Sequence, residues 1–185
     1  MPDSATVIRP ALIGDAGEIL TVQRAAFVSE AQSHGDPWLP PLTETLDAVA
    51  AAIETGTVLV LRLVDDGREG RLVGAVRREL RGHTVQIGRL VVAPDRQGHG
   101  FGSRLLAAAE DVPGAATAEL FTGHLATANL ALYARRGYVE FDRSRTSDQV
   151  VLVFLRKPLT PTPDSARPRP ADSPPASPDG GGSGG

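Results

Sequence analysis

Three glycines alternate with other residues in a short segment between a strand-like and a helix-like stretch. Gly98, Gly100 and Gly102 follow the apolar stretch Val85–Ala93 and precede apolar residues at helical spacing. Such a loop aims free backbone N–H groups at an anion, and glycine lets the backbone approach a ligand closely. No Asp or Glu lies between residues 97 and 109, although acids normally favour the first turn of a helix. The segment therefore predicts a binding site for the phosphates of a ligand.

Two familiar phosphate-binding loops do not fit this segment. A P-loop requires Lys and then Ser or Thr after its last glycine, whereas Gly102 is followed by Ser103 and Arg104. A dinucleotide-binding fold requires a glycine at position 103 and usually carries its motif on an early strand, whereas about 90 residues precede this loop. A tight turn without a ligand stays open as an alternative.

Cysteine and histidine usage limits the chemistry further. The sequence has no cysteine, which excludes disulfides, thiolate metal sites and a cysteine nucleophile. The four histidines show no metal-ligand spacing, so no metal site is expected.

The elements that must position the loop follow from the periodicity of the apolar residues. The expected strands are 7–8, 58–64, 72–80, 85–93, 118–122, 138–141 and 150–155. The expected helices are one with a capping-box-like start at Asp15 and Glu18, one over Thr43–Thr55 that ends before Gly56, one after the glycine loop, and a short one that ends at Gly137. Residues 35–41 are expected to form a loop. The order β-α-α-β-β-β-α-β-α-β-β predicts a mixed α/β domain around a single sheet with helices on its faces.

Composition separates this domain from the end of the chain. Eight of the 15 prolines lie between Pro158 and Pro178, and five glycines follow within the last six residues. A segment with one leucine and no other large apolar residue cannot offset the entropy of ordering itself. We expect residues 1–157 to form the domain and residues 158–185 to form a disordered tail, although the Pro-x-x-Pro spacing would also suit a proline-recognition module.

Charge and hydropathy exclude several kinds of partner. The chain of 185 residues has a formal net charge of −3, which argues against a protein that neutralises nucleic-acid phosphates. The N-terminus has no signal-peptide pattern, and no apolar stretch approaches 18 residues. We therefore expect a cytoplasmic protein that binds neither nucleic acid nor a membrane.

Two motifs resemble those of the GCN5-related N-acetyltransferases, the GNAT family. Residues 97–102, Gln-Gly-His-Gly-Phe-Gly, resemble the family's Q/R-x-x-G-x-G/A pyrophosphate loop, and Val92-Ala93-Pro94 resembles the end of its preceding strand. Residues 133–138, Tyr-Ala-Arg-Arg-Gly-Tyr, resemble its later Y-x-x-x-G-[FY] motif. The resemblance covers about residues 5–157 and implies a mixed, mostly antiparallel sheet with helices on both faces.

The resemblance implies that acetyl-CoA is the acyl donor. The backbone of Leu90, Val91 and Val92 would pair with the pantetheine arm, although the same side chains also suit a core. The backbone amides that would hold the pyrophosphate are those of Gln97, Gly98, His99, Gly100, Phe101, Gly102 and Ser103. Arg96 and Arg104 would add positive charge or lie on the solvated surface.

The resemblance also implies acyl transfer to a primary amine, either a small molecule or a protein. Tyr133 stands where the family keeps the general acid that protonates the departing thiolate, and an N–H near Val92 would stabilise the oxyanion. Without cysteine, direct attack by the amine on the thioester is the simplest route. Homodimers are frequent in the family, and the sequence leaves the oligomeric state open.

Two departures from the family pattern bear on catalysis. The position of a common family asparagine holds Ala126, so the contact with the cofactor arm would either be made by Asn129 from a shifted position or be lost. The cofactor strand offers Gln86 where many relatives carry a glutamate as general base. The remaining candidates for the base are Glu79, Glu119, His34 and His124, or a water relay.

The first two helices and their loop shape the acceptor pocket in this family. The residues that would line it here are Phe27, Glu30, His34, Asp36 and Trp38, and the two acids would suit a cationic amine. Two alternatives stay open: an acyl-CoA-binding module without catalysis, and a transferase for longer acyl groups.

Overall fold

Seven strands form one sheet in the order β1-β2-β3-β4-β5-β7-β6, and the computed structural model describes residues 5–146 and 150–160. Neighbouring strands are antiparallel except β4 and β5, which are parallel. The strands are β1 (Thr6–Pro10), β2 (Val58–Asp65), β3 (Arg68–Arg81), β4 (Thr84–Val92), β5 (Thr117–Gly123), β6 (Val139–Arg145) and β7 (Val151–Pro158). The α-helices are α1 (Ala16–His34), α2 (Pro40–Thr43), α3 (Leu46–Glu54), α4 (Phe101–Glu110) and α5 (Thr127–Arg135). The predicted mixed α/β class is therefore confirmed.

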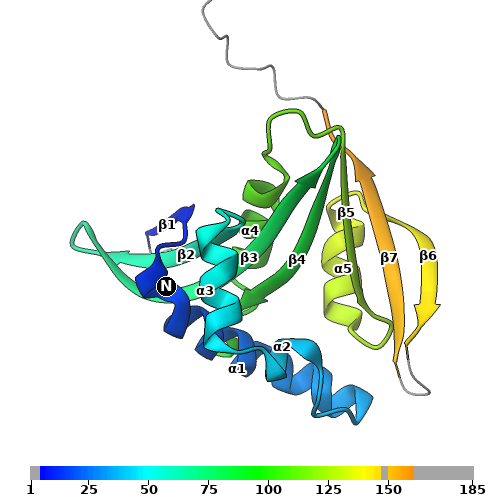
Figure 1. Cartoon of the computed structure of the whole chain (residues 1–185), viewed down its shortest axis with the longest axis horizontal. Coiled ribbons are helices and arrows are strands. Elements are labelled where there is room, and N and C mark those ends of the chain that lie inside the picture. Colours follow the sequence, from blue (N-terminus) through cyan, green and yellow to red (C-terminus); the bar gives the residue numbers. More distant parts are fainter. Residues whose placement is uncertain (1–4, 147–149, 161–185) are drawn as a thin grey trace, which may run out of the picture.

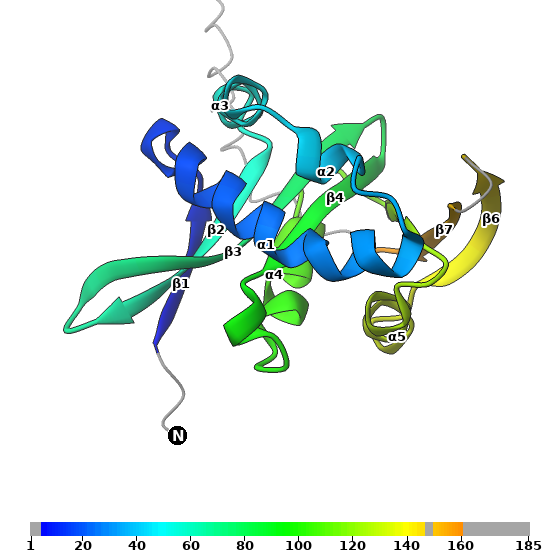
Figure 2. The same ribbon diagram turned by 90° about the horizontal axis from the view of Figure 1, so that it is seen from below.

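Helices cover both faces of the sheet, with α1, α2 and α3 on one face and α4 and α5 on the other (Figure 2). Strand β3 is buried from Leu72 to Val76, as expected for a strand covered on both sides. A β-carbon at Gly74 would lie 2.7 Å from Leu105 Cδ1 of α4 and 3.0 Å from the Val91 carbonyl oxygen of β4. Gly74 thus lets α4 pack directly on the sheet, and this packing places the start of α4 beside the end of β4.

The segment between α1 and β2 differs from the prediction in two ways. The expected helix over Thr43–Thr55 begins later, at Leu46, because the Thr45 hydroxyl caps α3 by accepting the N–H of Ala48 at 3.2 Å. Part of the expected loop over residues 35–41 is helical, since Pro40 and Pro41 open the one-turn helix α2. Proline suits such a first turn, because its fixed φ is helical and no N–H is needed there.

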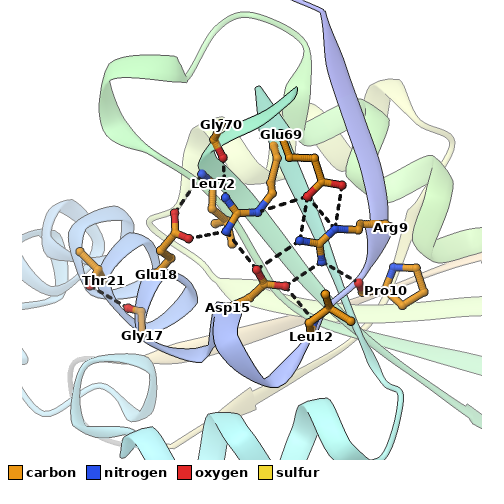
Figure 3. Close-up of polar contacts among 11 residues, drawn as sticks. Arg9, Pro10, Leu12, Asp15, Gly17, Glu18, Thr21, Glu69, Gly70 and Leu72 are labelled. Atoms are coloured by element: carbon orange, nitrogen blue, oxygen red, sulfur yellow. Dashed lines mark hydrogen bonds and ion pairs between the residues drawn. The ribbon is translucent and has the colours of Figure 1, made fainter. Parts of the chain in front are cut away.

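The predicted capping box at Asp15 and Glu18 is wrong. Asp15 precedes α1 but accepts no hydrogen bond from the helix, and instead accepts Arg9 Nη1 and the Leu12 N–H, both at 2.7 Å. Figure 3 shows Asp15 and Glu18 at the start of α1 facing the strands. Both acids also pair with Arg62 of β2. Charged partners on the strands outcompete the helix amides, so the cluster anchors the start of α1 to the sheet.

A β-bulge changes the course of β4 near its end. Gly88 pairs with Arg77 and Val91 pairs with Ala75, so Arg89 and Leu90 together oppose one residue of β3. Arg89 has a φ of 51°, which is rare for a residue other than glycine. Bulges bend a strand and re-aim its groups, and they are frequent beside functional sites.

Strand β7 extends to Pro158, and Leu159 donates its N–H to the Ala116 carbonyl oxygen at 2.8 Å. The first two residues of the predicted tail therefore contact the domain. The expectation of disorder for residues 161–185 falls outside the described residues. None of the helices in the described ranges is long and apolar enough to cross a membrane.

Candidate active site

Strands β4 and β5 pair only from Thr84 with Thr117 to Ile87 with Leu120, and then separate. Figure 1 shows the two strands together at one end and apart at the other. A cavity of about 570 Å³ lies at this opening and is lined by α1, the end of β4, the glycine loop with the start of α4, and α5. The separation exposes backbone of β4 that a closed sheet would pair. The opening is therefore the candidate site.

The glycine loop and the start of α4 form one part of the cavity lining. Gly98 and Gly100 have φ values of +77° and +78°, a conformation that favours glycine. The first helical amide with a backbone partner is that of Arg104, which donates to the Gly100 carbonyl oxygen at 3.1 Å. The amides before it have no partner within the helix and can donate to a ligand. Arg135 and Arg96 line the same cavity and add positive charge.

The cofactor residues predicted from the motifs meet at this cavity, with one exception. The predicted residues that line it are Leu90, Val91, Val92, Gln97, Gly98, Gly100, Phe101, Gly102, Ser103 and Asn129. The Gln97 side chain donates to the Val92 carbonyl oxygen at 3.2 Å and so links the loop to the end of β4. The exception is His99, which is exposed, and its Nδ1 lies 2.8 Å from the Gln97 carbonyl oxygen.

Helix α5 contributes its first turns to the opposite wall. Ala126 and Asn129 both line the cavity, and Asn129 Nδ2 donates to the Thr122 hydroxyl at 3.4 Å. Asn129, Leu132 and Arg135 lie on one helix face at three-residue spacing, and all three line the cavity. This spacing is the signal by which Arg135 could have been found from the sequence.

Tyr133 lies one helical turn after Asn129 and is the buried residue of α5. Its side chain is 6% exposed and is not among the lining residues, and its ring lies 5.9 Å from that of Tyr138. Burial and the nearby Glu30 carboxylate raise the pKa of Tyr133 well above its usual value. The phenol therefore keeps its proton at neutral pH, with its hydroxyl within electrostatic range of the α1 side of the site.

Two of the predicted candidates for the general base lie away from the cavity. Gln86 donates to Glu119 at 3.0 Å in the closed part of the sheet, and Glu119 also pairs with Arg156 at 3.7 Å. Glu79 is exposed and pairs with Arg81 at 2.9 Å. Neither carboxylate lines the opening.

The predicted acceptor residues separate into two groups. Phe27 and Glu30 line the cavity, and His34, which is 4% exposed, lies one helical turn beyond Glu30. Trp38 is 77% exposed, and Asp36 accepts the Trp38 N–H at 2.8 Å. Trp38 and Asp36 therefore form a surface turn beyond the end of α1.

A group of ionisable side chains gathers where the end of α1 meets β5. Glu30 lies close to Gly123, and the His34 ring lies 5.5 Å from that of His124. Burial raises the pKa of Glu30, while His34 and the Gly123 backbone amide act in the opposite direction. Sequence reasoning missed Gly123 because its role depends on an approach between segments about 90 residues apart. Among the described residues, no three acids or histidines are arranged to hold a metal ion.

Comparisons with known proteins agree with this architecture. The family model of the acetyltransferase (GNAT) domain matches residues 55–140. A curated relative, the UPF0157 protein YqkA of Bacillus subtilis, is 29% identical over 138 residues. That match covers 74% of this chain, and the chain spans about 38% of the length of YqkA.

Solved structures share the fold at low sequence identity. The yncA protein from Salmonella typhimurium, solved with acetyl-CoA, is 19% identical with a TM-score of 0.63, and the match covers 88% of this chain and all of that one. The ribosomal-protein-S18-alanine N-acetyltransferase from Escherichia coli is 18% identical with a TM-score of 0.65, over 88% of this chain and 99% of that one. Residues 55–140 therefore match the GNAT acetyltransferase domain, the family that the two motifs resemble, and the chain shares the fold of the solved GNAT structures.

Proposed function

We propose that this protein is an N-acetyltransferase that moves the acetyl group of acetyl-CoA to a primary amine by direct attack. The observation that carries the proposal is that the glycine loop, with the free amides of the α4 start, and the end of β4 that β5 leaves unpaired line one cavity. The first would hold the pyrophosphate of coenzyme A and the second its pantetheine arm. The yncA relative solved with acetyl-CoA supports the choice of donor.

Different parts of the cavity bind the cofactor, stabilise the oxyanion and supply the proton. Amides of the loop and Arg135 hold the phosphates, and the backbone of β4 beyond the bulge lies along the arm and offers N–H groups to the developing oxyanion. The amine nitrogen attacks the thioester carbonyl carbon, so a C–N bond forms and the C–S bond breaks. Tyr133 is protonated at neutral pH and donates its proton to the departing sulfur.

The amine enters from the side of α1. Phe27 gives that wall an apolar surface and Glu30 gives it a carboxylate, which suits an amine that arrives as a cation. The acceptor is a primary amine of a small molecule or of a protein, so the test includes both small amines and peptides with free N-termini.

The test is turnover of acetyl-CoA with a panel of amines by the full chain. Tyr133→Phe is expected to lower kcat by about 10²-fold because it removes the proton donor and little else. Gly100→Glu is expected to abolish acetyl-CoA binding in calorimetry, because it adds a side chain and a negative charge at the anion site. Unchanged turnover in Tyr133→Phe would contradict its role, and normal binding by Gly100→Glu would contradict the placement of the pyrophosphate.

A second candidate is an acyl-CoA-binding module without catalysis. It is favoured by Gln86 on the cofactor strand, which is held by Glu119, and by the absence of Tyr133 from the described cavity lining. Tight acetyl-CoA binding with no turnover on any amine would support it. Comparison of acetyl-, propionyl- and succinyl-CoA in the same assay separates acetyl transfer from transfer of a longer acyl group.

A further inference from the structure

Glu30 is a carboxylate of α1 that lines the candidate active site and lies close enough to Tyr133 of α5 that burial and this carboxylate together raise the pKa of that phenol. It lines the same cavity as Leu90, Val91 and Val92, where the thioester would lie if the proposed function holds. It is the cavity's only lining acid among the described residues. Position alone therefore distinguishes Glu30 from Glu79 and Glu119.

The carboxylate of Glu30 is partly buried and is not part of a structural ion pair in the described ranges. No Arg or Lys forms a salt bridge with Glu30 within the described ranges, whereas Glu44 and Glu110 both have such partners. The carboxylate instead lies against the backbone of Gly123, at the end of β5. Burial raises the pKa of Glu30, which brings a carboxylate closer to the range in which it accepts a proton effectively near neutral pH.

The titratable neighbours of Glu30 come from three elements. His34 follows it on α1, His124 lies just after β5 with its ring 5.5 Å from that of His34, and Tyr133 approaches from α5. His124 Nδ1 accepts the Val151 N–H at 3.4 Å, so the ring hydrogen lies on its other nitrogen, Nε2. A proton taken up by Glu30 therefore has ionisable groups beside it.

We infer that Glu30 is the general base that removes a proton from the acceptor amine, and that Gly123 positions it. This assignment rests on the proposed acetyl transfer. It places the base on α1 and not on the cofactor strand, where Gln86 cannot accept a proton usefully.

The proton balance is complete with the groups present. Glu30 takes one proton from the bound ammonium and leaves a neutral amine, whose lone pair attacks the thioester carbonyl carbon. When the C–S bond breaks, Tyr133 gives its proton to the sulfur and regains one from the nitrogen as the amide forms. Glu30 then releases its proton to solvent, so one proton leaves per turnover.

The experiment compares Glu30→Gln with wild type and with Glu54→Gln, a matched change of an exposed acid at the end of α3. Glu30→Gln keeps the size of the side chain and removes only its basicity. We expect kcat to fall by about 10²-fold, with acetyl-CoA affinity and Tm unchanged. Glu30→Asp is expected to recover part of kcat, because it restores the carboxylate at a greater distance from the amine.

The pH profile of kcat separates a base from a binding group. In wild type the fall of kcat at low pH reports protonation of Glu30. In Glu30→Gln this fall should be replaced by one that reports protonation of the amine, so that kcat rises with pH up to the pKa of the amine itself. An unchanged kcat with a raised KM for the amine would mean that Glu30 only attracts the cation, and would overturn the inference while leaving the acetyl transfer intact. A wild type that turns over no amine would overturn both.

Discussion

His34 and Gly123 approach so closely that a β-carbon at position 123 would lie 2.4 Å from His34 Nε2. The same β-carbon would lie 3.1 Å from Glu30 Oε1. Gly123 ends β5, and its backbone is not in the left-handed region. Glycine is needed here because α1 approaches closely, and not because the chain turns. The acceptor side of the site thus depends on a glycine that carries no chemistry of its own.

Substitution of this glycine is expected to affect catalysis more than stability. Gly123→Ala forces the ends of the His34 and Glu30 side chains to move, since both would lie closer than ordinary contact. We expect kcat to fall about 10-fold or more and acetyl-CoA affinity to stay unchanged, because the phosphate loop lies elsewhere. Gly17→Ala, in the first turn of α1 with nothing within 4 Å of the added carbon, is the matched control and should leave kcat unchanged. Equal kcat values for the two variants would contradict the positioning role.

Arg135 is expected to contribute to acetyl-CoA binding, whereas Arg104 is not. Arg135 lines the same cavity as the glycine loop, and Arg104 is exposed and does not line it. Arg135→Ala should weaken binding by roughly 10-fold, the scale of one charge-assisted contact, and the loss should shrink as salt is added. Calorimetry at two salt concentrations checks this, with Arg104→Ala as the control. A larger effect at Arg104 would place the phosphates on the other side of the loop.

Asp15 is expected to make stability depend on pH in the acid range. Although burial raises it, the pKa of Asp15 falls to about 2 because Arg9, the Leu12 N–H and Arg62 donate to the carboxylate. A carboxyl with a lowered pKa stabilises the fold above its unfolded value of 3.8, and this contribution disappears as pH falls toward 2. The shift corresponds to about 2 kcal/mol of the free energy of unfolding.

Urea unfolding of wild type and Asp15→Asn between pH 2 and 7 tests this expectation. The stability difference between the two should be largest above pH 4 and should narrow toward pH 2, while Glu54→Gln should follow wild type throughout. Parallel curves for wild type and Asp15→Asn would show that the cluster in Figure 3 does not act through this charge.

Gly74 is expected to be required for packing of α4 on the sheet. In Gly74→Ala the added carbon would meet Leu105 Cδ1 at 2.7 Å and the Val91 carbonyl oxygen, which is backbone and cannot rotate away, at 3.0 Å. We expect a loss of about 1–3 kcal/mol in the free energy of unfolding. Gly88→Ala on the adjacent strand β4, with open space around the added carbon, should cost less than 1 kcal/mol. Chemical denaturation of both variants measures the two losses in the free energy of unfolding, and equal losses would contradict the packing argument.

Local patterns in the sequence were sufficient to predict most of the elements and the glycine loop that lines one end of the cavity. Gly98, Gly100 and the start of α4 lie within a few residues of one another, so the conformation of glycine and the orphan amides of a helix start determine that end locally. The strand over residues 58–64 was also predicted from its local pattern, and it corresponds to β2. The capping prediction at Asp15 was wrong because its side chain pairs with Arg9 of β1 and not with the amides of α1.

Short-range patterns could not predict the acceptor side, because it is made by segments far apart in the chain, and Phe27 and Glu30 were expected there only from the family resemblance. Glu30 and Gly123 have ordinary surroundings in the sequence, and only the docking of α1 on the end of β5 brings them together. Likewise, the tyrosine motif identifies Tyr133, but the rotation of α5 decides that Asn129 and Arg135 face the cavity while Tyr133 packs inside. The sequence by itself determined the order of elements and the conformation of the glycine loop through short-range sterics and hydrogen bonding. The tertiary structure alone decided which carboxylate enters the site, because burial and proximity arise only when the helices pack on the sheet.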